Sequence, residues 1–326
     1  MAIKLNDLGT AAQEAKQKID EVIVEIKKVL VGQDVLVRSM LIALLADGHL
    51  LVEGVPGLAK TLAVTTLAKV INADFKRIQF TPDLLPADLL GTSIFNPQNA
   101  TFSVKKGPIF TNILLADEIN RAPAKVQSAL LEVMQERQAT IQGETFHTKE
   151  PYLVLATQNP IEQEGTYPLP EAQTDRFMMK VLLNYPNREE EKEIIKRMAM
   201  QQGKPTVTAK ITAAEVLLVR QIVDQIHCDE RIMDYILDLI FSTRTPKGPI
   251  VGLLQFGASP RASIALKMAA QAHAFLEGRG YVDPYDIKSV AYAVLRHRLR
   301  RTYEAEAEEI SPDAILDMIL KSTKVP

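Results

Sequence analysis

The segment GVPGLAKT, residues 54–61, constrains the fold of this chain more than any other part of the sequence. It follows the P-loop pattern of Gly, four residues, Gly, Lys and Ser or Thr, except that Ala59 replaces the second glycine. The preceding HLLVEG is typical of a buried strand that ends in a turn, and the following TLAVTTLAKV has helical periodicity. A strand, a turn and a helix in this order are the context in which such a loop binds phosphate groups.

A phosphate-binding loop surrounds its ligand with backbone N–H groups, and it needs glycine only where φ is positive or where a Cβ would touch the ligand. We expect Gly54 and Gly57 to meet these needs, and Ala59 to lie where helical dihedral angles have begun. Lys60 would then reach the β- and γ-phosphates, and the Thr61 hydroxyl would bind Mg²⁺. The loop alone also fits a plain strand-to-helix turn. The expected nucleotide-binding residues of the loop are Gly54, Val55, Pro56, Gly57, Leu58, Ala59, Lys60, Thr61 and Leu62.

Two adjacent acids, Asp117 and Glu118, end a second apolar run, NILLAD. Carboxylates at the tip of a buried strand repel each other and lose solvation, so they call for a compensating positive charge. Mg²⁺ bound to a nucleotide would supply it, with Asp117 holding the metal's water shell and Glu118 polarising the water that attacks the γ-phosphate. The alternative is an Asp that caps the next helix beside a solvated Glu. The presence of Lys60 and Thr61 favours the metal site.

Three further polar residues fit the same chemistry. Asn159, in LVLATQNP, can hydrogen-bond both the attacking water and a γ-phosphate oxygen. Arg176 directly precedes the last apolar run, and an arginine aimed at the γ-phosphate stabilises charge that grows in the transition state. Arg261 starts a helix after Ser-Pro, where a cation opposes the helix dipole, so an anionic ligand would explain it. The alternatives are a turn Asn beside proline and surface ion pairs, with Asp175 available to Arg176.

Helical stretches separate most of the short apolar runs of the first half, which predicts an α/β fold with a parallel sheet covered by helices on both faces. Two helices, broken at 31–34, precede this alternation. Two segments, 91–110 and 138–148, have alternating patterns around turn residues and predict inserted β-hairpins, which are candidates for partner contacts. The expected strands are 49–54, 77–80, 112–117, 152–157 and 178–183.

The second half reads as a smaller, all-helical unit. We therefore divide the chain into a nucleotide-binding core, 1–190, and a linker helix with a helical lid, 191–326. The basic run RHRLRR, 296–301, is interpreted as a helix end whose cations suit the dipole, followed by a solvated acidic turn, EAEAEE. The expected lid helices are 214–227, 230–243, 260–278, 284–301 and 312–321.

Composition limits the classes of function. Apolar residues make up 47% and charged residues 24% of the 326, no apolar run reaches 18 residues, and Cys228 is the single cysteine. These values predict a cytoplasmic protein without membrane insertion, internal disulfides or a thiolate zinc cluster. With a formal net charge of −2, the chain lacks the global basic field that would call for a nucleic-acid partner.

Taken in order, these motifs resemble those of the AAA+ ATPases and, within them, of the MoxR family. GVPGLAKT resembles the family's Walker A loop, Ala59 included, and LLADEINRAP its Walker B motif. ATQNP is similar to sensor 1, EAQTDRF to the arginine-finger segment and SPRAS to sensor 2. The two predicted hairpins resemble the family's insert in helix 2 and its hairpin before sensor 1. The resemblance spans residues 20–310.

The resemblance implies an αβα core with strand order 5-1-4-3-2, a helical lid, ATP or ADP with Mg²⁺ as cofactors, and ring oligomers, usually hexamers. It also implies that Arg176 is donated to the nucleotide of a neighbouring subunit, that Arg261 acts from the lid of the same subunit, and that Arg121 reaches across an interface. Family members act as chaperone-like remodellers of client proteins, often with partners that carry a von Willebrand factor A domain.

The leading hypothesis from the sequence is a Mg²⁺-dependent ATPase that remodels partner proteins. A nucleotide-gated scaffold, in which turnover is incidental, fits the same residues. A DNA or RNA motor would draw on Lys105, Lys106 and the basic run 296–301. A GTPase is disfavoured because the sequence has no Asn/Thr-Lys-x-Asp motif that would read a guanine base.

Overall fold

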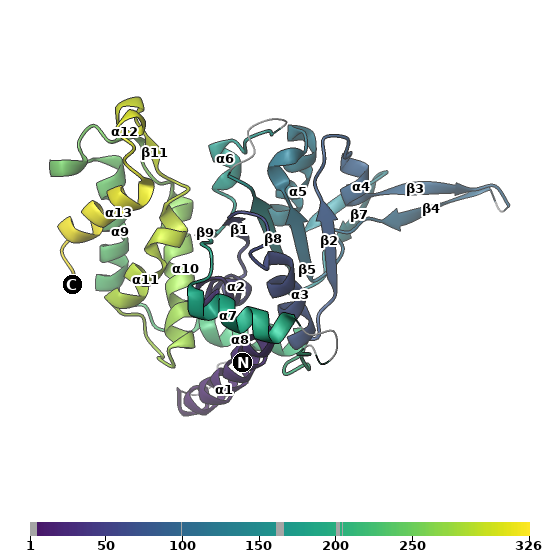
Figure 1. Cartoon of the computed structure of the whole chain (residues 1–326), viewed down its shortest axis with the longest axis horizontal. Helices are drawn as coiled ribbons and strands as arrows, with labels where there is room; N and C mark the ends of the chain where they lie inside the picture. The colour runs from purple at the N-terminus through teal and green to yellow at the C-terminus, as the bar shows by residue number, and fades with distance from the viewer. Residues whose placement is uncertain (1–4, 99, 161–165, 200–202, 204) are drawn as a thin grey trace.

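The computed structural model describes residues 5–98, 100–160, 166–199, 203 and 205–326. Its central sheet has five parallel strands in the order β2-β5-β8-β1-β9 (Figure 1). Numbered along the chain within this sheet, the order is 5-1-4-3-2, so the predicted topology is confirmed. The strands are β1 (Leu50–Glu53), β2 (Phe75–Gln79), β5 (Ile113–Asp117), β8 (Leu153–Gln158) and β9 (Met179–Leu182).

Apolar clusters cover both faces of the sheet at the central strands β1, β5 and β8, which explains why these strands read as nearly continuous apolar runs, whereas the edge strand β2 is partly exposed and polar. Leu50 and Val52 of β1 belong to one cluster, and Leu51, between them, belongs to the other. Because successive side chains of a strand point to opposite faces, a strand between two covered faces must be apolar at every position. Among the helices that contribute to these clusters are α1 (Leu5–Val29), α2 (Asp34–Leu45) and α3 (Lys60–Val70) on one face and α5 (Ala124–Glu136) on the other.

The break between α1 and α2 lies at the predicted residues 31–34. Gly32 and Gln33 there have φ angles of 65° and 56°, a left-handed conformation that a helix cannot continue. Among the described residues, none of the helices combines the length and the apolar character needed to cross a bilayer.

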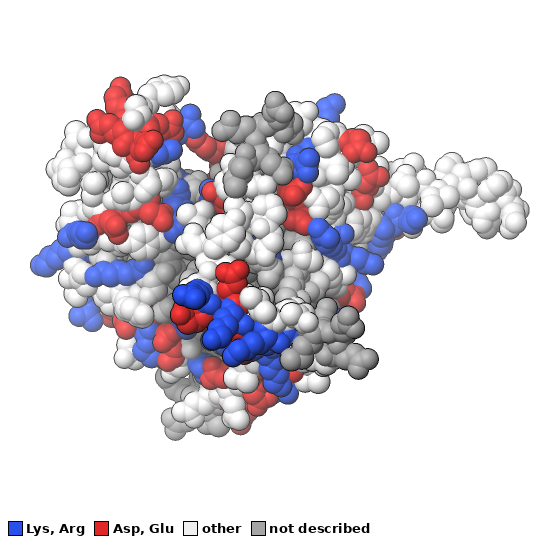
Figure 2. Space-filling view, in the orientation of Figure 1, with Lys and Arg blue, Asp and Glu red and all other residues white. Residues whose placement is uncertain are grey.

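Both predicted hairpins are present. The first, β3 (Gly91–Asn96) with β4 (Thr101–Lys106), extends away from the body of the molecule, and its surface is almost free of charge (Figures 1 and 2). Its exposed rings Phe95 and Phe102 lie 5.1 Å apart between centroids. The second hairpin, β6 (Gln138–Ile141) with β7 (Glu144–His147), packs against the body of the molecule, since its residues Ala139 and Ile141 are buried.

The second half is mostly helical, but the prediction that it is all-helical is wrong. Leu254–Phe256 (β10) and Arg300–Arg301 (β11) form a small antiparallel sheet, and the helix expected over 284–301 ends at Leu295. Three short helices were also missed, α4 (Pro86–Leu90), α6 (Glu171–Thr174) and α12 (Tyr303–Ala307). The longer helices are α7 (Arg188–Met198), α8 (Ala213–Asp224), α9 (Glu230–Arg244), α10 (Pro260–Leu276), α11 (Pro284–Leu295) and α13 (Pro312–Ser322).

The basic run 296–301 is not the end of a helix with solvated cations. The Arg298 side chain is only 3% exposed and donates from Nε to Asp175 at 2.7 Å and from its terminal nitrogens to the carbonyls of Phe177 and Met178. Arg296 forms a two-pronged ion pair with Asp313. Arg298 therefore binds groups beside the start of β9, whereas Arg296 binds α13, and the chain leaves the helix to place both side chains.

The helical half shares its apolar core with the first half, because one cluster runs from α1 to α13. Within the lid, Asp286 of α11 is fully buried and accepts hydrogen bonds from His273 Nδ1 at 2.6 Å and from Arg279. Burial raises the pKa of Asp286. The hydrogen bonds from His273, Arg279 and the Asp283 backbone lower it by more, so that the pKa falls to about 2.

This ion network predicts acid sensitivity. The pKa of Asp286 is about 2 in the folded chain, and its ordinary value is 3.8. The ionised Asp286 carboxylate therefore stabilises the folded state fully above pH 3.8, and this stabilisation is lost as the pH falls through 2. We expect the unfolding free energy of the wild type, relative to D286N, to fall by about 2 kcal/mol between pH 6 and pH 2. Urea unfolding across this range measures it, and a difference that stays constant with pH would contradict the role of Asp286.

Candidate functional site

A cavity of about 460 Å³ lies at the edge of the sheet where β1, β5 and β8 end. In open α/β sheets, ligands bind outside the carboxyl ends of the strands, and the volume is in the range of small-molecule sites. The structure thus brings Lys60, Thr61, Asp117, Glu118 and Asn159 together from three segments of the chain. The lining residues are Pro56, Gly57, Leu58, Ala59, Lys60, Thr61, Leu62, Arg77, Gln79, Asp117, Glu118 and Asn159.

Gly57 has the conformation expected of it, whereas Gly54 and Ala59 differ from the expectation. Gly57 has the expected positive φ, 88°, and a Cβ built there would meet no atom within 4 Å. Gly54 permits close packing instead, because a Cβ would approach the Leu183 Cβ to 3.0 Å. The expectation of helical dihedral angles at Ala59 is wrong, since φ is 56° and ψ is 21°. The loop therefore imposes a left-handed turn one residue before α3, and alanine is strained there.

The beginning of α3 is suited to an anion. Ala59, the residue before the helix, makes no side-chain cap, and the first turn contains no acidic residue. The first N–H groups of a helix have no partner within it and carry partial positive charge, so an uncapped start facing a cavity favours phosphate. Lys60 Nζ donates to the Gly54 carbonyl at 2.7 Å. Burial lowers the pKa of Lys60, while Asp117 and Glu118 raise it.

The two acids are held in fixed positions by hydroxyl and backbone groups. Asp117 Oδ1 accepts from the Thr157 hydroxyl at 2.6 Å, and the Glu118 N–H donates to the same hydroxyl at 2.9 Å. Glu118 itself has left-handed angles, φ 57° and ψ 50°. Such angles in a residue other than glycine are costly and are concentrated at functional sites.

Two arginines and a glutamine that were not predicted for this site contact the acids. Arg77 of β2 forms an ion pair with Asp117 at 2.5 Å, and Gln79 Nε2 donates to Glu118 Oε2 at 2.7 Å. Arg121 pairs with Glu118 of its own chain at 3.0 Å. Positive charge beside the acids is thus supplied partly by the protein. The only signal for Arg77 and Gln79 in the sequence was their alternate spacing in the short run RIQF.

The oxygen donors of the cavity fit Mg²⁺. A hydroxyl, Thr61, and a carboxylate, Asp117, line the same cavity, and hard oxygen ligands are those that Mg²⁺ prefers. Among the described residues, no three His, Cys, Asp or Glu side chains are grouped as a metal cage. Mg²⁺ is usually bound through one or two carboxylates together with substrate phosphates.

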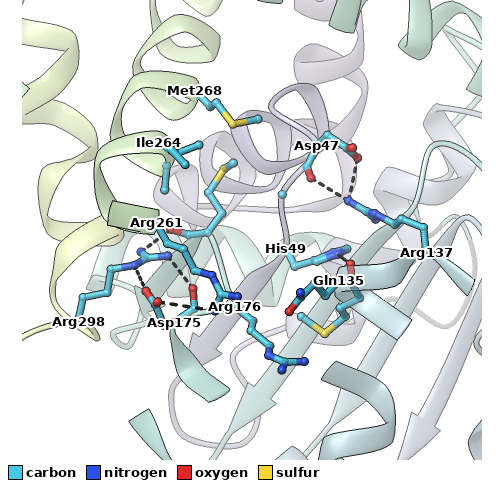
Figure 3. A pocket seen from close by; sticks show the side chains of 14 residues that line it. Asp47, His49, Gln135, Arg137, Asp175, Arg176, Arg261, Ile264, Met268 and Arg298 are labelled. Atoms are coloured by element: carbon cyan, nitrogen blue, oxygen red, sulfur yellow. Dashed lines mark hydrogen bonds and ion pairs between the residues drawn. The ribbon is translucent and has the colours of Figure 1, made fainter. Parts of the chain in front are cut away.

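A second cavity, of about 530 Å³, holds the other two expected arginines. Arg176 and Arg261 both line it, around Asp175, which accepts from Arg298 (Figure 3). Asp175 also accepts from the Ser259 hydroxyl at 2.9 Å. Arg261 Nη1 lies 3.9 Å from Asp175, as a loose ion pair. The Arg176 Nε is buried without a hydrogen-bond partner in the described structure.

The two cavities lie at opposite ends of β1. Asp47, Gly48 and His49, which line the second cavity, precede β1, whereas the phosphate loop follows it. Leu50 pairs with Met179, so the residues just before β9, including Arg176, lie at the same amino edge. The structure therefore does not bring Arg261 or Arg176 to the Lys60 of the same chain.

Comparison with known proteins identifies the family. Residues 49–179 match the ATPase family associated with various cellular activities (AAA), and residues 252–319 match the AAA lid domain. Chaperone MoxR1 of Mycobacterium tuberculosis is 49% identical over 312 residues, which cover 94% of this chain and 82% of that protein. The chain belongs to the MoxR family of AAA+ ATPases. The resemblance inferred from the five motifs is therefore confirmed.

Other members of the family extend the comparison. The protein MoxR of Methylorubrum extorquens is 30% identical over 313 residues, covering 89% of this chain and 90% of that protein. A crystal structure from Cytophaga hutchinsonii, provisionally described as an ATPase, superimposes with a TM-score of 0.94 at 49% identity and covers all of both chains. Membership of this MoxR family implies ATP hydrolysis.

The left-handed Ala59 predicts a stabilising substitution. Glycine adopts this conformation without the penalty of about 1–2 kcal/mol that a Cβ imposes, although it also makes the unfolded chain more flexible. We expect A59G to raise the unfolding free energy by about 0.5–1 kcal/mol. The matched control is A214G, in the first turn of α8, which should lower it by a similar amount. Destabilisation by A59G in thermal unfolding would show that Ala59 is unstrained.

Proposed function

We propose that this MoxR-family chain is a Mg²⁺-dependent ATPase that works in a ring oligomer and remodels partner proteins. The observation that carries the proposal is the convergence of Lys60, Thr61, Asp117, Glu118 and Asn159 on one cavity at the carboxyl edge of the sheet. P-loop ATPases need a cationic loop, a metal site and a group that orients water, and this set provides all three.

Each residue has a distinct role in the proposed reaction. The loop amides and Lys60 bind the phosphates, while Thr61 and Asp117 would hold Mg²⁺. When bound, the metal neutralises charge on the transferred phosphoryl group. Glu118 accepts the proton of the attacking water, and Asn159 orients that water.

The arginine cavity supports assembly of subunits head to tail. Arg176 and Arg261 lie at the amino edge of the sheet and Lys60 at the carboxyl edge, which favours a site completed by the arginines of a neighbouring subunit. A heterologous contact that repeats around a closed ring would place both arginines of one subunit at the nucleotide of the next. This revises the sequence-based expectation that Arg261 acts within its own subunit. Six subunits remain the expected number.

Remodelling of partners is supported by a relative and by the shape of the chain. The relative from M. tuberculosis is named a chaperone. The β3–β4 hairpin exposes Phe95 and Phe102 on a projection with little charge (Figures 1 and 2), and exposed apolar patches are typical of protein-binding surfaces. We propose that client proteins, including partners with a von Willebrand factor A domain, contact this projection.

The role of Glu118 is tested by removing its charge. We expect E118Q to bind ATP with unchanged affinity and to hydrolyse it at least about 10²-fold more slowly, because only the proton acceptor is lost. Calorimetry measures the binding and phosphate release the turnover. The control is E304Q, an exposed change in the lid, which should leave both values unchanged. Normal hydrolysis by E118Q would refute the assignment, and normal cellular function of an inactive E118Q would favour the nucleotide-gated scaffold.

Mixing two inactive variants tests donation between subunits. We expect K60A and R176A each to lose turnover, and an equal mixture to regain about a quarter of wild-type activity, because random assembly pairs an intact loop with an intact arginine at one interface in four. The same mixture with R261A in place of R176A should recover equally. If turnover recovers in the mixture with R176A but not in the mixture with R261A, Arg261 acts on the nucleotide of its own subunit.

A further inference from the structure

The backbone around Arg176 is held firmly in place. In the turn that follows α6, the Arg176 N–H donates to the Gln173 carbonyl at 3.3 Å. The next residue, Phe177, is fully buried and belongs to the apolar cluster that also contains α5. Because both sides of Arg176 are anchored in this way, movement at this position is confined to its side chain.

The carboxylate next to Arg176 in the chain is already engaged. Asp175 Oδ1 accepts from Arg298 Nε at 2.7 Å, and its Oδ2 accepts from the Ser259 hydroxyl at 2.9 Å. In the part of the chain that the structure describes, Arg176 Nε is buried and has no hydrogen-bond partner. Buried donors are rarely left without a partner, because the loss of their hydration is costly. We therefore expect Arg176 Nε to have a partner when the arginine is in use.

A matching acceptor lies in the same place. Among the described residues, Gln173 Oε1 is also buried without a hydrogen-bond partner. Gln173 and Arg176 both line a third cavity, of about 260 Å³, whose other wall is α5. They are three residues apart in a helical turn, a spacing that makes side chains neighbours. A donor and an acceptor that each lack a partner thus share one cavity.

The amide of Gln173 is oriented by α5. Its Nε2 donates to the Ser128 hydroxyl oxygen at 3.2 Å. Since the nitrogen and the oxygen lie on opposite sides of the amide, a nitrogen bound to Ser128 turns the oxygen away from α5. A guanidinium has only donors, so this oxygen is the one atom of the Gln173 amide that Arg176 can bind.

We propose that Gln173 is a positioning residue for Arg176, and that its Oε1 accepts the Arg176 Nε–H when the arginine reaches the nucleotide of the neighbouring subunit. The guanidinium is planar, so a hydrogen bond at Nε sets its plane and leaves both Nη nitrogens for phosphate oxygens. Ser128 keeps the amide in the required orientation. This role rests on the proposed function, since it requires Arg176 to be donated across an interface.

A neutral acceptor suits this task better than the acids nearby. Glu132 and Glu136 of α5 also line the third cavity, but both are exposed, so solvent screens their attraction for Arg176. A carboxylate bound to the guanidinium would also offset the positive charge that stabilises the phosphates in the transition state. The Gln173 amide fixes the direction of Arg176 and leaves its charge intact.

The test replaces Gln173 in the full chain and measures ATP turnover over a range of ATP concentrations. Q173M keeps the length of the side chain but loses the acceptor. We expect kcat to fall about ten- to hundredfold, the range for one hydrogen bond to a charged group, with KM nearly unchanged. Q173E keeps an acceptor and should lose no more than about threefold. The matched control is Q17M, an exposed change on α1, which should have no effect. Normal turnover by Q173M, or an equal loss in Q173E, would overturn the proposal.

Two combinations of variants distinguish positioning from a structural role. Because Gln173 acts only through Arg176, adding Q173M to R176A should slow turnover no further, and a further loss would overturn the proposal. An equal mixture of Q173M and K60A should regain about a quarter of wild-type turnover, since one interface in four pairs an intact loop with an intact Gln173. No recovery would place the effect of Gln173 in its own subunit and also overturn the proposal.

The variant R176A separates this inference from the proposed function. Loss of turnover in R176A together with normal turnover in Q173M would contradict only the role of Gln173. Normal turnover in R176A would refute the donation of Arg176 to a neighbouring subunit, and the role of Gln173 with it.

Discussion

Parallel pairing of β1, β5 and β8 is the constraint on which the candidate site depends. Leu50 lies opposite Leu155, and Ile113 opposite Leu153, so the three strands end at one edge. Because both faces of this sheet are covered, a register slip would leave apolar residues buried but would move the polar strand ends out of alignment. The first polar residues after each strand therefore meet around one cavity, although they come from distant parts of the chain.

Besides the shared apolar cluster, charge pairing fixes one contact between the lid and the core. Arg298 is nearly buried, and such a charge is tolerated only with an anionic partner and further hydrogen bonds. Asp175 and the carbonyls that follow it supply them, which anchors the segment after α11 beside the start of β9. Arg261, at the start of α10, lies 3.9 Å from the same Asp175 and lines one cavity with Arg176. One electrostatic anchor thus gathers the arginines on the face opposite Lys60, in keeping with a site shared between subunits.

Much of the fold and the main site residues could be predicted from local patterns. Apolar runs and helical periods identified the strands, and the motifs containing Lys60, Asp117 and Asn159 located the cavity, because each motif lies at a strand end. Arg77 could not be assigned in this way, since an arginine on a short strand has no motif, and its partner Asp117 lies on the adjacent strand. The left-handed conformation of Ala59 was also missed, because an alanine gives no indication that its φ is positive.

The sequence by itself determined the family, the strand order and the chemistry of the phosphate loop with its acid pair. The phosphate loop and the acid pair follow from residues that are close in sequence, where spacing and periodicity reflect local geometry, whereas the strand order was implied by the resemblance to the family. The tertiary structure alone decided that Arg176 and Arg261 share a cavity away from Lys60, that the run 296–301 anchors the lid, and that Arg77 and Gln79 contact the two acids. Each of these depends on contacts between segments far apart in the chain, because the strength of a charge or a hydrogen bond depends on distance in space.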